Sequence, residues 1–238
     1  MLIKVGLENG IEGRSLAWAI DFPGCFAYGS DGPEALMSIP RALLAYHAWL
    51  DRHTPDSWLK DLGDFDVRLV DVWQVYYLDE QYEPAEQGRE INAWFQSDWM
   101  PLSRLEVQRG AAMLQWSRQD LLDTAQPLGD ARLDQPISGE KRTLRGILTH
   151  VANAEWWYLD QFKLAGMAYT SLPKDDVFAR LRIVRQQTQA VLAEMPGREQ
   201  VTGVGGELWS PRKLLRRLLW HEQDHIEHIR KLLVSGAV

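Results

Sequence analysis

The sequence contains a single cysteine, Cys25, among its 238 residues. A lone cysteine excludes an internal disulfide framework and any metal or redox site built on a Cys-x-x-Cys pair. No stretch approaches the run of about 18–20 uninterrupted apolar residues that a membrane-spanning helix needs. The opening residues, MLIKVGLENG, have neither the apolar core nor the small-residue cleavage site of a secretory signal. We therefore expect a cytoplasmic protein with no membrane partner.

The sequence also lacks an excess of positive charge. It has 26 Lys and Arg residues against 33 Asp and Glu residues, a net charge of −7. Residues 1–80 hold 6 basic and 13 acidic residues, whereas residues 81–238 hold 20 of each, so the whole acidic excess lies in the first third. A protein that binds nucleic-acid phosphates is expected to be strongly basic, and nucleic acid is therefore not an expected partner. The uneven distribution of charge indicates two modules.

The first eighty residues carry the signals of a small α+β module. Leu2–Leu7 alternates as a strand does, and Asn9-Gly10 after it favours a hairpin turn. Asp31–Leu50 begins with a capping residue and continues as an amphipathic helix. Asp66–Leu78 is rich in Val and Tyr, which favours another strand. Residues 81–100 are mostly polar and irregular, and we interpret them as a linker.

Residues 101–238 show the 3.6-residue spacing of apolar side chains that is typical of helices. Ser103-x-x-Glu106 is a capping box at the start of the first of them. The predicted helices cover about residues 105–122, 143–164, 173–195 and 211–234. Helices of about 20–25 residues are each about 30–38 Å long. Four such helices in succession predict an all-α four-helix bundle.

Three histidines of the predicted bundle suggest a metal site. His221 and His225 are four residues apart on the last helix, so both rings lie on one face and can reach a common point. A third ligand must come from another helix, and His150 is the only histidine in the other three. Three imidazoles with one open coordination position suit Zn²⁺, Ni²⁺ or Fe²⁺ and leave room for water or substrate.

The histidine spacing by itself is also compatible with a polar helix face that binds no metal. Two histidines four residues apart often arise by chance on such a face. His228 lies seven residues after His221, on the same side of the helix, and this obscures which pair would bind a metal. The four-residue spacing favours His221 and His225, with His228 one turn further on as a pocket residue.

The segments around these histidines resemble the DinB/YfiT-like superfamily. The residues that carry the resemblance are TLRGILTHVANAEWWYL around His150 and WHEQDHIEHI around His221 and His225, and it extends over about residues 101–236. The resemblance implies an up-down-down-up bundle, in which one histidine of the second helix and an HxxxH pair of the fourth hold a divalent metal. It also implies two types of reaction, transfer of a low-molecular-weight thiol to an electrophile and metal-assisted hydrolysis. Bundles of this superfamily are often dimers, so a homodimer is an expectation.

Residues 1–55 resemble the domains of HicB-like antitoxins, which pair a small antiparallel sheet with a helix. The resemblance rests on DFPGCFAYGSDGPEAL, from Asp21 onward, and on the amphipathic helix that follows, with Val67–Leu78 completing the sheet. The DNA-binding segment that such antitoxins usually add is not found in this sequence. Cys25 falls in the Pro-Gly-Cys turn, and we interpret it as a packing residue because no nearby His or Lys would activate its thiol.

Further side chains near the histidines are candidates for the site. Asp224, directly before His225, is the candidate acid or base. The candidates for the pocket or for contacts that support the metal ligands are His228, Glu155, Trp157 and Trp220. Four basic residues at 212, 213, 216 and 217 are typical of a solvated helix face, although an anionic substrate could use them.

Two hypotheses of function follow. In the first, a divalent metal on His150, His221 and His225 activates a thiol or a water molecule, and the chain is a thiol S-transferase or a hydrolase of small molecules. Thiol transfer is slightly favoured. In the second, the chain is a non-catalytic regulatory protein, in which the bundle is a metal-stabilised platform and acidic residues 1–80 bind a protein partner. An open metal position that faces a solvent-connected pocket would favour the enzyme.

Overall fold

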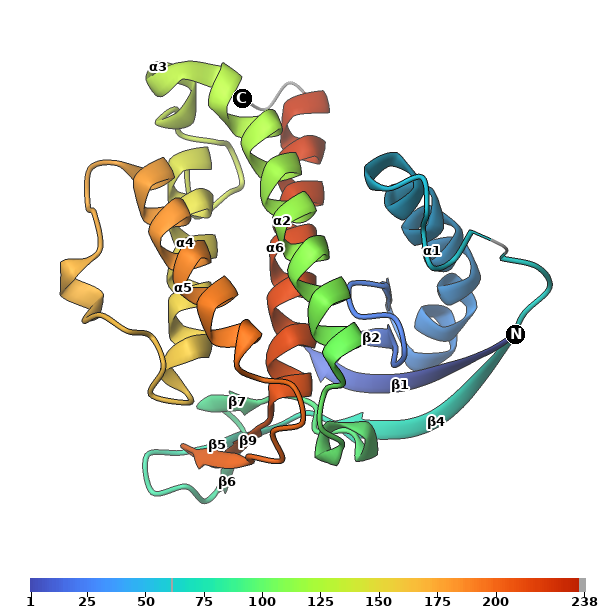
Figure 1. Ribbon diagram of the computed structural model, residues 1–238. Coiled ribbons are helices and arrows are strands. Elements are labelled where there is room, and N and C mark those ends of the chain that lie inside the picture. The colour runs from blue at the N-terminus through green and yellow to red at the C-terminus, as the bar shows by residue number, and fades with distance from the viewer. Residues whose placement is uncertain (61, 236–238) are drawn as a thin grey trace. The chain divides into compact units, whose positions relative to one another are not determined.

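The computed structural model describes residues 1–60 and 62–235. It divides the chain into two compact units (Figure 1). The first, here called the sheet unit, comprises Met1–Met100 and Val201–Lys213, and the second, the helical unit, comprises Pro101–Gln200 and Leu214–Val238. The predicted succession of a sheet-containing region and a helical region is thereby confirmed. In the described ranges, none of the helices has the length and apolar character needed to cross a bilayer.

The sheet unit is built on a four-stranded sheet in the order β3-β2-β1-β4. Its elements are β1 (Leu2–Ile11), β2 (Arg14–Ala19), β3 (Phe26–Gly29), α1 (Gly32–His53) and β4 (Asp66–Gln74). The first three strands are antiparallel, but β4 runs parallel to β1. The predicted antiparallel sheet is therefore a mixed one. The reason is the connection from β3 through α1, because a helical crossover brings the next strand back in the same direction.

Helix α1 forms where the sequence predicts it and packs against the sheet. The side chain of Asp31 accepts a hydrogen bond from the backbone N–H of Glu34, as expected of a capping residue. Ile39, Leu43 and Leu50 are fully buried on one face of the helix. Cys25, at the turn before β3, is also buried, and burial raises the pKa of its thiol to about 12. A thiol this hard to ionise fits the predicted packing role.

Residues 81–100 belong to the sheet unit, where the sequence predicts a linker. They contain β6 (Pro84–Ala85), β7 (Arg89–Ile91) and the 3-10 helix η1 (Gln96–Trp99), and β6 and β7 pair with β5 (Tyr76–Leu78). The predicted strand 66–78 is thus two strands, divided at Val75. Ile91, Ala93 and Phe95 are buried, and the carboxylate of Glu8 accepts a hydrogen bond of 2.7 Å from the Ala93 backbone. Three apolar residues that alternate with polar ones are too short a pattern to reveal from the sequence that this segment packs into the sheet unit.

The sheet unit also takes in residues 201–213, which lie beyond the predicted boundary at residue 100. They form the hairpin of β8 (Thr202–Val204) and β9 (Glu207–Trp209) and the first turn of α6 (Pro211–Val234). Lys213 is fully buried, and its Nζ lies 2.7 Å from Oε1 of Glu207 and donates to the carbonyl of Asn92 at 3.2 Å. Arg216 and Arg217 are buried as well. The prediction that the basic residues at the start of this helix form a solvated face is therefore wrong.

The helical unit contains the four long helices that the sequence predicts. They are α2 (Arg104–Ala125), α4 (Leu144–Asp160), α5 (Val177–Ala193) and α6, with the short α3 (Gly129–Leu133) and the 3-10 helices η2 (Gln126–Leu128) and η3 (Tyr169–Ser171) between them. Figure 1 shows α2 and α6 running one way and α4 and α5 the other, which is the up-down-down-up order. Residues 161–176 form the long connection that two parallel helices require.

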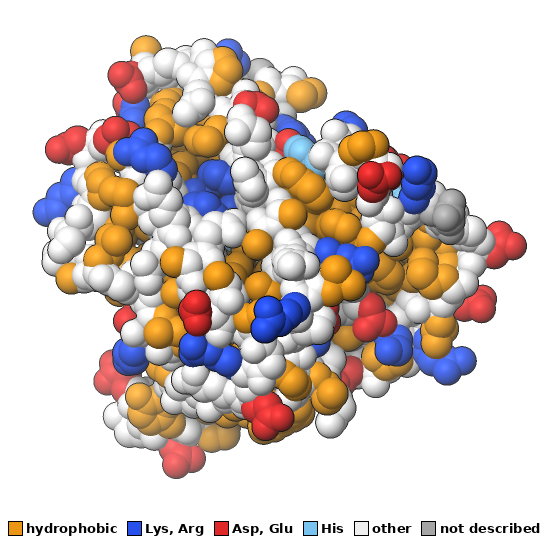
Figure 2. Space-filling model, in the orientation of Figure 1, with side chains coloured by type: hydrophobic (Ala, Val, Ile, Leu, Met, Phe, Trp, Pro, Cys, Tyr) orange, Lys and Arg blue, Asp and Glu red, His pale blue; other side chains and the backbone are white. Residues whose placement is uncertain are grey.

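The ends of these helices follow the capping residues in the sequence. Ser103 and Glu106 form the predicted capping box of α2, and Thr143 caps α4 by accepting a hydrogen bond from the Gly146 N–H. Helix α4 is shorter than predicted, because the chain leaves the helix after Asp160 and Lys163 adopts a positive φ of 59°. On the face shown in Figure 2, acidic and basic side chains are interspersed with apolar ones.

Four charged side chains meet inside the bundle, one from each long helix. We call them the buried ionic quartet: Arg118 of α2, Glu155 of α4, Arg185 of α5 and Glu222 of α6. Arg118 donates to Glu155 at 2.5 Å and to Glu222 at 2.6 Å. Arg185 donates to the same two carboxylates at 2.6 and 2.9 Å, and each arginine also donates to a backbone carbonyl. Two positive and two negative charges thus balance in a water-poor interior.

Removal of one charge from the quartet should strongly destabilise the helical unit. In a Glu155→Gln variant, Arg118 and Arg185 would share one carboxylate, and breaking a buried ion pair costs about 3–5 kcal/mol. We expect a loss of that size in the free energy of unfolding, measured by urea denaturation and followed by far-UV circular dichroism. A change below about 1 kcal/mol would contradict a structural role of the quartet.

Glu227 offers the matched control, because its ion pair with Arg230 is exposed. Glu227→Gln should alter the same free energy by less than about 0.5 kcal/mol.

The quartet also predicts sensitivity to acid. Burial by itself would raise the pKa of Glu155, but the charges of Arg185 and Arg118 outweigh it and hold the pKa well below its usual range. The contribution of Glu155 to stability is therefore complete above pH 4.5 and is lost as the pH falls through the folded-state pKa.

Candidate metal centre

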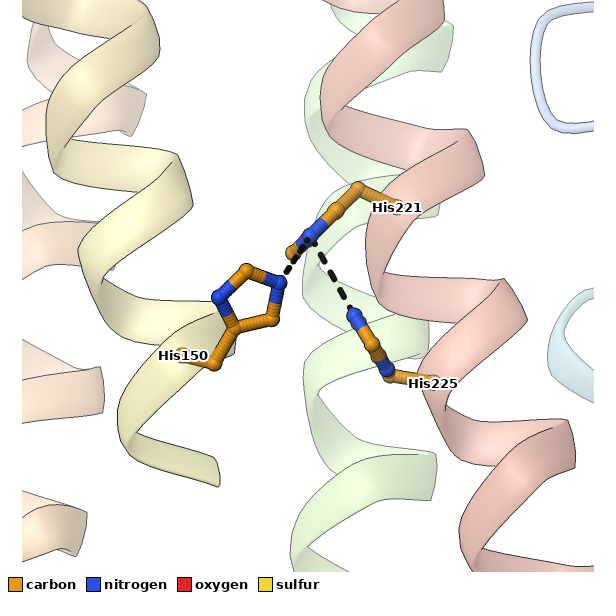
Figure 3. Close-up of side chains that lie close together, drawn as sticks. All are labelled: His150, His221 and His225. Atoms are coloured by element: carbon orange, nitrogen blue, oxygen red, sulfur yellow. Dashed lines mark hydrogen bonds between the residues drawn. The ribbon is translucent and has the colours of Figure 1, made fainter. Parts of the chain in front are cut away.

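Three histidines from two helices converge in the helical unit (Figure 3). His221 and His225 are one turn apart on α6, and His150 projects from α4 toward them. Nε2 of His221 lies 3.1 Å from Nε2 of His150 and 3.3 Å from Nε2 of His225. The structure thus brings together the three residues that the sequence predicts as metal ligands.

The spacing of the Nε2 atoms fits a shared metal ion. With metal–nitrogen bonds of about 2.0–2.1 Å, neighbouring ligand atoms are about 2.9 Å apart in an octahedral site and about 3.4 Å apart in a tetrahedral one. The distances of 3.1 and 3.3 Å fall within this range. A neutral imidazole also has only one nitrogen lone pair, so the Nε2 atom of His221 cannot form good hydrogen bonds with both neighbours at once. A cation between the rings would use all three lone pairs.

The protonation state of the site also favours a metal. Burial lowers the pKa of His221 well below 6.5, and the neighbouring His225 and His150 lower it further. Burial lowers the pKa of His225 to about 3, with His150 and His228 adding to the effect. Both rings are therefore neutral at pH 7, as metal binding requires. Neutral ligands would leave the full charge of a bound divalent cation uncompensated.

The triad borders a solvent-connected cavity of about 240 Å³. His150 and His225 form part of its wall, and the loop before α4 forms another part. His228 lies on this wall and makes a 3.0 Å contact through Nε2 with Oε1 of Glu140. His228 thus occupies the pocket position that its spacing suggests. Its partner Glu140 is a site residue that sequence reasoning missed, because nothing in the loop before α4 marks it.

The aromatic neighbours of the triad differ in part from those predicted. The ring of Trp220 lies 5.8 Å from that of His221, and the guanidinium of Arg217 stacks on the Trp220 ring at 4.2 Å. Trp157 is 38% exposed. The adjacent residue Tyr158 is buried, and its ring lies 6.0 Å from that of His221. The choice between neighbouring residues depends on the rotation of α4, which the sequence pattern does not determine to within one residue.

The two predicted acidic residues have different surroundings. Glu155 belongs to the buried ionic quartet, in which its carboxylate pairs with two arginines. It therefore has a structural role and does not line the pocket as the sequence predicts. Its partners in the quartet have no motif that marks them in the sequence. Their only signal is position, since Arg118 follows Leu114 by four residues on an apolar stripe. Asp224 is half-buried and lies about 100° around α6 from His225.

One comparison with known protein families covers this site. Residues 113–229, which include all three histidines, match the family model of the DinB superfamily. A solved structure similar to this chain is YfiT from Bacillus subtilis, described as a probable metal-dependent hydrolase with an unusual four-helix bundle topology. It shares 17% sequence identity over 65% of this chain and 93% of YfiT, with a TM-score of 0.45. No curated protein matches the chain. The family match supports the predicted DinB-like character of the helical unit.

The lowered pKa values predict that the metal-free protein loses stability in mild acid. An unfolded histidine titrates near pH 6.5, whereas folded His225 resists protonation down to about pH 3. Between these values the unfolded chain binds more protons, so the free energy of unfolding falls as the pH is lowered. Each buried histidine should account for up to about 2 kcal/mol between pH 6.5 and 5. Thermal unfolding of the metal-free protein at these two pH values measures the loss.

A His225→Leu variant should show a smaller drop in melting temperature between pH 6.5 and 5 than the parent. His53→Gln, in the sheet unit, is the control and should leave the drop unchanged. Equal drops in the parent and in His225→Leu would contradict the lowered pKa of His225.

Proposed function

We propose that this chain is a metal-dependent enzyme whose divalent ion is held by His150, His221 and His225. The observation that carries the proposal is the convergence of three Nε2 atoms, at distances of 3.1 and 3.3 Å, beside a cavity that two of the rings line. A structural zinc site would use four protein ligands, whereas three leave a position for water or substrate. The described residues near the triad offer three ligand atoms that meet this requirement.

When bound, the ion would lower the pKa of a water molecule or a thiol to near neutrality and so supply a nucleophile. The rest of the chemistry belongs to side chains of this chain. The neutral rings of His221 and His225 would hold the ion without cancelling its charge, which would favour binding of an anionic nucleophile. Tyr158 and Trp220 pack against the ring of His221 and would shield it from water. The reacting groups then approach from the cavity.

The reaction we favour is transfer of a low-molecular-weight thiol to an electrophile, with hydrolysis as the second candidate. Both use the same open position, so the triad by itself supports either. Asp224 is our candidate for the residue that takes up or returns a proton, because it is half-buried and directly precedes His225. The choice of Zn²⁺, Ni²⁺ or Fe²⁺ follows availability as much as affinity.

The cavity distinguishes this proposal from a non-catalytic role. A metal used only to stabilise the bundle needs no access from solvent. The triad of this chain borders an open cavity, and two of its three ligands line the wall. An accessible metal position therefore favours turnover over a purely structural ion.

The metal content of protein purified without a nickel column tests the proposal. We expect about one equivalent of a divalent metal in the parent and almost none in a His221→Ala/His225→Ala variant, measured by inductively coupled plasma mass spectrometry. His228→Ala is the matched control, because His228 lies on the same cavity but outside the triad, and it should retain the metal.

Turnover should follow the metal. The loaded parent should consume thiol in the presence of an electrophile, or cleave an ester or amide, at rates that removal of the metal abolishes. Absence of metal from the parent, with no uptake of added Zn²⁺ or Ni²⁺ by folded protein, would overturn the proposal. Metal-loaded protein without either activity would support the non-catalytic alternative.

A further inference from the structure

Arg142 lies at the edge of the metal centre, in the loop that leads into α4. It directly precedes Thr143, the capping residue of that helix. Arg142 lines the cavity of about 240 Å³ that His225 also borders, and a second, more open cavity of about 470 Å³. His150 is the other residue shared by both. Arg142 and the predicted metal ligand His150 thus both lie at the boundary between the two cavities.

The fold holds the stem of this arginine against the first turn of α4. A Cβ atom added to Gly146 would lie 3.1 Å from Cβ of Arg142 and 3.6 Å from its Cγ. The absence of a side chain at Gly146 therefore lets the arginine lie close to the helix. Its charge acts on the metal site, because Arg142 is among the groups that lower the pKa values of both His221 and His225.

Two other charged residues at the cavities, Arg145 and Glu140, have partners, whereas Arg142 and its exposed neighbour Lys141 have no carboxylate partner among the described residues. Arg145 donates at 2.6 Å to each of two carboxylates, those of Asp130 and Asp134. Glu140 is in contact with His228. Within the ranges 1–60 and 62–235, Arg142 has no carboxylate at ion-pair distance. An unpaired guanidinium beside an uncompensated metal charge makes this edge of the site attractive to an anion.

We infer that the substrate of the metal centre carries a second, negatively charged group, of the carboxylate kind, and that Arg142 binds it. The inference rests on the proposed function and adds the class of substrate to it. The guanidinium presents two parallel N–H donors that match a carboxylate, and the reacting group of the same molecule would lie at the triad. Arg142 is then a specificity-determining residue, distinct from the ligands of the metal.

A pair of small thiols that differ in charge provides the test. Mercaptoacetate carries a carboxylate and 2-mercaptoethanol does not, and both present one thiol. We expect the zinc-loaded parent to bind mercaptoacetate about tenfold more tightly, measured by isothermal titration calorimetry. In Arg142→Gln the preference should fall several-fold, with binding of 2-mercaptoethanol and zinc content unchanged, and what remains is chelation of zinc by the carboxylate. Arg142→Lys, which keeps the charge but loses the paired donors, should lie between them.

Arg182→Gln is the charge-matched control, because Arg182 is an exposed arginine on α5 that lines a different cavity. It should keep the full preference for mercaptoacetate. Equal affinities for the two thiols in the parent, or an undiminished preference in Arg142→Gln, would overturn the inference. So would zinc-loaded protein that binds neither thiol.

The failure of this inference can be separated from the failure of the proposed function. If the parent takes up no metal, the proposed function fails, and the anion site is then tested on the metal-free protein with acetate and inorganic phosphate. Binding of either ion by the parent and not by Arg142→Gln would support an anion site at this position. Tighter binding of phosphate than of acetate would assign the second group to the phosphate kind. Equal binding by parent and variant, or by neither, would overturn it.

Discussion

The arrangement of the helical unit depends on the buried ionic quartet. Charges are stable in a protein interior only when each is paired and hydrogen-bonded, and here two guanidiniums and two carboxylates satisfy one another. Because each of the four long helices contributes one residue, a shift of any helix along its axis would leave a charge unpaired. Glu222 follows His221 directly, and Glu155 lies five residues after His150. The network that positions the helices therefore also positions the three histidines.

The quartet and the candidate metal centre differ in how their charges are compensated. The quartet has no net charge, so it links the four helices by ion pairs and does not attract a charged ligand. His221 and His225 are neutral at pH 7, so they would not cancel the charge of a bound divalent ion. Arg142 adds a positive charge at the mouth, and its carboxylate partner is not supplied by the described residues. This distribution places positive charge at the mouth of the site, where it would attract an anionic ligand.

The sheet unit takes its chain from two distant parts of the sequence. Residues 81–100 and 201–213 join the first eighty residues, and Lys213 forms a buried ion pair with Glu207 while donating to the Asn92 carbonyl. The start of α6 thus belongs to one unit and the rest of the helix, with His221 and His225, to the other. The HicB-like character of residues 1–80 and their protein partner stay predictions. What the structure adds is a parallel edge strand, β4, which the helical crossover from β3 makes possible.

Local patterns in the sequence were sufficient to predict the four long helices, the caps at Asp31 and Ser103, and the placing of His221 and His225 on one face of a helix. Capping and the i, i+4 spacing involve residues within one turn of each other, so they can be recognised without knowledge of the fold. The same patterns do not reveal that residues 81–100 pack as strands, that Glu155 is a structural ion, or that Arg142 lies beside the triad. Such features depend on contacts between residues far apart in the chain, for which no local pattern exists. The partner of each buried charge is set by the tertiary structure, because the fold alone brings the separate helices and loops together.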